Sequence, residues 1–133
     1  MAAGGGVMRV AAILIAFSLT ACGVGKANAE GTYANAIPCW WALESRAKMY
    51  RTQGFTDVPD KMEARSELYK NDAMIAGSKI SKDQKQVLID MQSYVGKEVA
   101  ELEAMTTEEQ AEASLKKLNA KADACFDAPL SEN

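Results

Sequence analysis

The sequence predicts an all-α protein: a small antiparallel bundle of four helices that run alternately up and down. Apolar residues recur with the period of an α-helix in four successive segments. Short stretches of helix-ending and helix-starting residues separate these segments, and short connections favour antiparallel neighbours. The chain has 133 residues, which is the length of one domain.

The first predicted helix covers Pro38–Gln53. Proline suits the first turn of a helix because an N–H has no partner there, and Gly54 stands where helices commonly end. The expected inward stripe, with Trp40 beside it, consists of Cys39, Leu43, Ala47 and Tyr50. By the same signals a second helix covers Pro59–Ala76 and ends at Gly77. Its weaker stripe consists of Met62, Tyr69, Ala73 and Ala76.

The third and fourth helices each follow a capping-box pattern. Ser81 and Gln84 have the spacing of such a box, as do Thr106 with Glu109 and Thr107 with Gln110. The expected inward stripe of the third helix is Leu88, Met91, Val95, Val99, Leu102 and Met105, and that of the fourth is Ala111, Leu115, Leu118, Ala122 and Cys125. The two stripes differ by about 120°, which predicts a turn at Met105–Thr107 rather than one long helix. Gly96, inside the third helix, suggests a close helix contact.

The first thirty residues differ from the rest of the chain, because every acidic residue lies at or after Glu30. Arg9 precedes an uncharged run, Val10–Leu19, that is too short to cross a membrane. A basic residue, a short apolar run and then small residues are typical of a secretory signal. Met8 directly before Arg9 would be a better start for such a signal than Met1.

Two cleavage sites follow the apolar run. Leu19-Thr20-Ala21-Cys22 resembles the lipobox of bacterial lipoproteins, and this resemblance implies that Cys22 carries the lipid and becomes the first residue of the mature chain. Ala27-Asn28-Ala29 is instead an A-x-A site for ordinary signal peptidase. The expected organisation is a signal peptide over 1–21 (alternatively 1–29), a flexible tether over 22–36, the bundle over 37–127 and a disordered tail over 128–133. The protein is then lipid-anchored on the periplasmic side of the cell envelope or, by the second route, a soluble periplasmic protein.

Two cysteines remain beyond Cys22, and an even number in an exported chain indicates a disulfide. Cys39 begins the first predicted helix and Cys125 ends the last, and these ends lie together in an up-down-up-down bundle. The sequence therefore predicts a Cys39–Cys125 disulfide. A redox-active pair of the thioredoxin type would need a C-x-x-C motif, which this chain lacks.

Composition argues against several chemistries. The chain has no histidine, which removes the commonest acid/base group and metal ligand, and it has no calcium-loop pattern. A net charge of −3, from 15 basic and 18 acidic residues, gives no reason to expect nucleic-acid binding. We therefore expect no cofactor, no metal and no catalysis, with an enzyme of unrecognised type as an alternative.

The expected role is protein–protein interaction in the cell envelope. Trp40 and Trp41 are about 100° apart on a helix, so one should pack in the core while the other is partly exposed for a partner protein or a lipid surface. Six glutamates over residues 98–112 form either a solvated face or an acidic docking patch. Glu98 lies within an apolar stripe, where it could pair with Arg46. The main alternative is a carrier or chaperone for an apolar ligand or client, which predicts a cavity lined by methionines.

Overall fold

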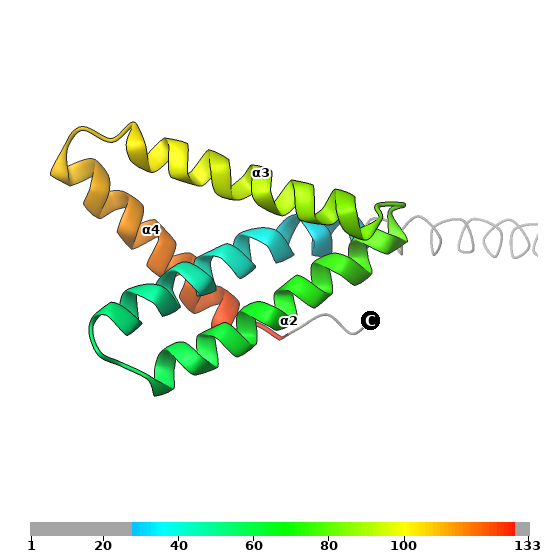
Figure 1. The fold of residues 1–133 in the computed structure, drawn as a ribbon, viewed down its shortest axis with the longest axis horizontal. Helices are drawn as coiled ribbons and strands as arrows, with labels where there is room; N and C mark the ends of the chain where they lie inside the picture. The colour runs from blue at the N-terminus through cyan, green and yellow to red at the C-terminus, as the bar shows by residue number, and fades with distance from the viewer. Residues whose placement is uncertain (1–27, 130–133) are drawn as a thin grey trace, which may run out of the picture.

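A computed structural model describes residues 28–129, and over this range the protein is built from four helices without a strand (Figure 1). The first helix is described over residues 28–52. It is followed by α2 (Asp57–Lys79), α3 (Gln84–Glu103) and α4 (Glu108–Asp127). The predicted all-α fold is confirmed, as is the turn that separates the third helix from the fourth.

The first helix begins earlier than its sequence predicts. Residues 28–36, expected in a flexible tether, are helical, and Ala29, Tyr33 and Ala36 are buried on one face. Pro38 therefore lies inside the helix, where it costs one backbone hydrogen bond, rather than at its start. The small polar residues between the buried ones conceal this stripe in the sequence. Cys22 with the rest of 1–27, and 130–133 of the predicted tail, lie outside the described residues.

The core contains residues from all four helices. Cys39, Leu43 and Ala47 of the first helix are almost completely buried, as their predicted stripe requires. The buried stripe of α2 also follows the prediction, and consists of Met62, Tyr69, Ala73 and Ala76. From the later helices the core takes only Val87 and Met91 of α3, and Ala122 and Cys125 of α4.

The predicted stripes of α3 and α4 are therefore wrong over half of each helix. Val99 and Leu102 near the end of α3 are exposed, as are Ala111 and Leu115 near the start of α4. Leu88, predicted to face inward at the start of α3, is exposed as well. The two helices diverge from their connecting turn instead of packing along each other, and α4 crosses the first helix at an angle (Figure 1). Helical periodicity reports which face of a helix is apolar, but the neighbour that covers that face depends on tertiary structure.

Glycine and capping residues also differ from expectation. Gly77 does not end α2 but lies buried inside it, where an added Cβ would lie 2.7 Å from Val87 Cγ2. An added Cβ at Gly96 would meet nothing within 4 Å, so the close helix contact is at Gly77. The capping box of α3 is Asp83 with Gln86 rather than Ser81 with Gln84. For α4, the predicted box of Thr107 and Gln110 is confirmed.

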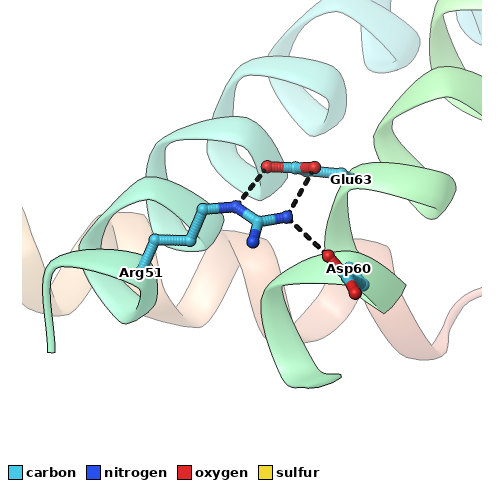
Figure 2. A network of polar contacts seen from close by, with 3 residues as sticks. All are labelled: Arg51, Asp60 and Glu63. Atoms are coloured by element: carbon cyan, nitrogen blue, oxygen red, sulfur yellow. Dashed lines mark hydrogen bonds and ion pairs between the residues drawn. The ribbon is translucent and has the colours of Figure 1, made fainter. Parts of the chain in front are cut away.

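Polar contacts fasten the first helix to α2 where the two are connected. Arg51 Nε and one terminal nitrogen each donate a 2.8 Å hydrogen bond to Glu63, and that nitrogen also donates to Asp60 Oδ1 at 2.6 Å (Figure 2). These hydrogen bonds to Arg51 lower the pKa of the Glu63 carboxyl. None of the helices over residues 28–129 is long and apolar enough to cross a membrane.

Candidate binding groove

A cavity of about 990 Å³, the groove, lies between the first helix, α3 and α4. Its apolar lining residues are Trp41, Met49, Leu102, Ala104, Met105, Ala111, Ala113, Leu115 and Leu118. Its polar lining residues are Ser45, Glu98, Glu101, Thr107, Gln110, Ser114, Lys117 and Lys121. The groove thus has nine apolar and eight polar lining residues, and its volume lies at the upper end of the range that is usual for ligand sites.

The first helix forms the floor of the groove. Trp41, Ser45 and Met49 recur every four residues, so they share one face of that helix. The Ser45 Oγ atom is buried, and within residues 28–129 it has no hydrogen-bond partner. A buried polar group without a partner is uncommon in folded proteins and costs free energy. The floor therefore combines two large apolar side chains with one unsatisfied hydroxyl.

The walls of the groove are the two half-helices that diverge from the α3–α4 turn. Leu102 of α3 is 50% exposed and Leu115 of α4 is 44% exposed, although both lie on the apolar faces of their helices. Leu118 is half-buried nearer the core. Neighbouring exposed apolar residues in a concave site are a common mark of an interaction surface.

The turn end of the groove is strongly acidic. Between Glu98 and Leu115 the sequence carries six glutamates and no lysine or arginine. Glu98 and Glu101 line the groove itself, and the other four are exposed around the turn. Burial together with the nearby Glu98 carboxylate raises the pKa of Tyr94 to about 12. Lys117 and Lys121 mark the other end of the groove, where Lys121 Nζ donates to Asn35 Oδ1 at 3.2 Å.

The end of α4 opposite the turn is firmly held. Arg46 forms an ion pair with Asp123 and donates a 3.1 Å hydrogen bond to the Asn119 carbonyl. Arg46 therefore pairs with α4, and the considered pair with Glu98 is not formed. The Tyr69 hydroxyl of α2 donates to the Cys125 carbonyl at 2.7 Å.

The start of α3 is held in a similar way. The Tyr33 hydroxyl donates to Asp90 Oδ2 at 2.6 Å, and Lys82 forms an ion pair with the same carboxylate. The Lys82 ammonium also lies 4.9 Å from the centre of the Tyr33 ring. Hydrogen bonds from Lys82 and Tyr33 lower the pKa of Asp90, and burial raises that of Tyr33. The groove is thus framed by two helices that are fixed at the ends remote from their shared turn.

The predicted disulfide is confirmed: Cys39 and Cys125 are bonded between the first helix and α4, and their Cα atoms are 5.5 Å apart. Trp40 packs against the core, whereas Trp41 lines the groove, and both are half-buried. The centroids of the Trp40 and Trp41 rings are 6.4 Å apart. Over residues 28–129 no cluster of cysteine and carboxylate side chains is suited to holding a metal ion.

Sequence reasoning did not locate the groove. Two methionines, Met49 and Met105, line it, as the carrier hypothesis requires in part, while Met62 and Met91 are core residues. The available signal was the coincidence of the acidic run with an apolar stripe near Glu98, because charges rarely interrupt a stripe that packs in a closed core. No family model, curated protein or solved structure matches this chain.

Proposed function

We propose that this protein is a non-catalytic binding protein that holds an apolar ligand or client in the groove. The observation that carries the proposal is the groove itself: a cavity of about 990 Å³ between the first helix, α3 and α4, with Trp41, Met49, Leu102, Leu115 and Leu118 among its lining residues. A bundle with no binding role would gain stability by closing the two helices over Leu102 and Leu115.

This proposal favours the carrier or chaperone hypothesis over interaction through the tryptophans alone. Trp40 packs against the core and does not line the groove, and its backbone carbonyl accepts a 3.2 Å hydrogen bond from Ser66. Trp41 contributes to the groove and so acts as part of it. The proposed role uses binding alone, without a cofactor.

We further propose that the protein acts in the cell envelope, exported by its N-terminal signal and anchored through a lipid on Cys22. The Cys39–Cys125 disulfide supports export, because such bonds persist in oxidising compartments. A lipid anchor would hold the groove near the membrane, and cleavage after Ala29 would instead release a periplasmic carrier. Intact mass measurement of the protein from its native membrane distinguishes the two, since it reports the first residue and any acyl groups.

The groove is tested by blocking it with a bulky side chain. Ala111 and Ala120 both lie on α4 and are exposed, but only Ala111 lines the groove. We expect the fluorescent apolar probe N-phenyl-1-naphthylamine to bind the native protein and the Ala120→Trp variant. The Ala111→Trp variant should lose most of that binding while keeping its thermal midpoint. Absence of probe binding to the native protein, or equal binding by both variants, would contradict the proposal.

A further inference from the structure

We infer that the occupant of the groove is a cationic amphipathic helix of a client protein. This inference rests on the proposed function and specifies its ligand. It follows from two properties of the groove, its helical walls and the sign of the charge at its turn end.

The shape of the groove suits a helix. Its floor and both walls are helices, so a helix laid between α3 and α4 would pack side chains against helical rows on three sides. Trp41, Met49, Leu102, Leu115 and Leu118 offer the apolar contacts that such a helix needs along one face. An amphipathic helix in an apolar groove is a recurring mode of peptide recognition. The flexible methionines Met49 and Met105 allow the lining to adapt to different apolar faces.

The charge around the groove selects the sign of the occupant. Glu98 and Glu101 lie in its wall, and Glu103, Glu108, Glu109 and Glu112 surround the turn. No basic residue occurs from Glu98 to Leu115, and the two basic lining residues, Lys117 and Lys121, lie at the other end of the groove. Complementary charge therefore favours lysine or arginine beside the apolar face of the occupant, at the end that lies near the turn.

The same charge argues against an uncharged amphiphile as the occupant, because such a ligand would gain nothing from the field of the acidic turn. A cationic helix uses both the apolar lining and the acidic turn.

The test compares synthetic peptides of four helical turns with the oxidised, full-length protein. One peptide has leucines at helical spacing flanked by lysines, a second has glutamates in place of the lysines, and a third is a scrambled form of the first. Fluorescence anisotropy should show binding of the lysine peptide only. Raising sodium chloride from about 50 to about 500 mM should weaken that binding, because exposed charges are screened.

Variants of the acidic wall sharpen the test. The double variant Glu98→Gln with Glu101→Gln should bind the lysine peptide about fivefold more weakly at low salt. The control, Glu30→Gln with Glu67→Gln, removes two exposed carboxylates that do not line the groove and should change binding less than about twofold. Ala111→Trp should abolish peptide binding.

Two results would overturn the inference: equal binding of the lysine and glutamate peptides, or displacement of the naphthylamine probe by a neutral single-chain detergent but by neither peptide. In both cases the probe still binds, so the groove remains a binding site with a different occupant. If neither probe nor peptide binds, the proposed function itself fails.

Discussion

Gly77 shows how one residue determines the distance between helices. It lies inside α2, opposite Val87 of α3 and the ring of Tyr33 from the first helix. Because glycine has only a hydrogen in place of a side chain, the three helices can approach one another here. Tyr33 of the first helix and Lys82 of the α2–α3 connection both contact Asp90 of α3. A glycine inside a helix lowers helix propensity, and at this position the close approach offsets that cost.

We predict opposite effects of alanine at the two interior glycines of α2 and α3. Gly77→Ala should lower the free energy of unfolding by about 1–3 kcal/mol, because the new Cβ would lie 2.7 Å from Val87 Cγ2 and 3.2 Å from Tyr33 Cε1. Gly96→Ala should raise it by up to about 1 kcal/mol, because a Cβ there meets nothing within 4 Å and alanine favours the helix. Urea denaturation measures both, and destabilisation by Gly96→Ala would refute this account.

At the level of elements, α3 and α4 are each held to the core over only half of their length. The start of α3 is held by Val87, Met91 and Asp90, and the end of α4 by Ala122 and Cys125. The halves that meet at the turn bury no residue completely. Their helical structure therefore depends more on local interactions, of which the capping box of Thr107 and Gln110 is the clearest.

Removing the N-cap of α3 and that of α4 should affect stability differently, because only the cap of α3 lies in a half-helix that packs on the core. In Thr107→Ala, we expect faster amide hydrogen exchange over residues 110–117 with little change in the thermal midpoint, because this half-helix is not tied to the core. In Asp83→Ala, the cap lies beside the anchored start of α3, so about 1 kcal/mol of global stability should be lost. A global loss from Thr107→Ala equal to that from Asp83→Ala would show that the turn region unfolds together with the core.

The sequence predicts elements better than it predicts how they pack. The four helices, the buried stripes of the first helix and α2, and the disulfide follow from spacing, because those faces are covered by near neighbours. The helical start over residues 28–36 is hidden because Ala29 and Ala36 look like tether residues until Tyr33 between them is seen to be buried. The groove is not predictable from spacing, because Leu102 and Leu115 have the same periodicity whether a helix covers them or not.

For the whole molecule, the disulfide is a covalent connection between described residues that lie 86 positions apart in sequence. It links the first helix to the anchored end of α4, where Arg46 and Tyr69 also hold that helix. Since both cysteines are almost fully buried, the bond belongs to the core and not to the groove. The core end of the molecule is thus fixed, while the turn end remains available for binding.

Replacing both Cys39 and Cys125 by alanine should lower the free energy of unfolding by about 4.5 kcal/mol, as expected from the entropy of closing so long a loop. Chemical denaturation of the native and double-alanine proteins measures the difference. The native protein in a reducing buffer serves as the control, and should match the variant apart from the cost of the lost side chains. A loss well below about 2 kcal/mol would show that the remaining contacts hold the ends of the chain together by themselves.

The position of the two sulfur atoms also sets an order of events during maturation. Cys125 follows the other three helices in the chain, so all of them have been synthesised before an oxidant can join it to Cys39. The cross-link therefore forms only on a chain that already contains all four helices. A chain whose helices paired wrongly would keep the two sulfur atoms apart, and a thiol-reactive dye would count two free thiols.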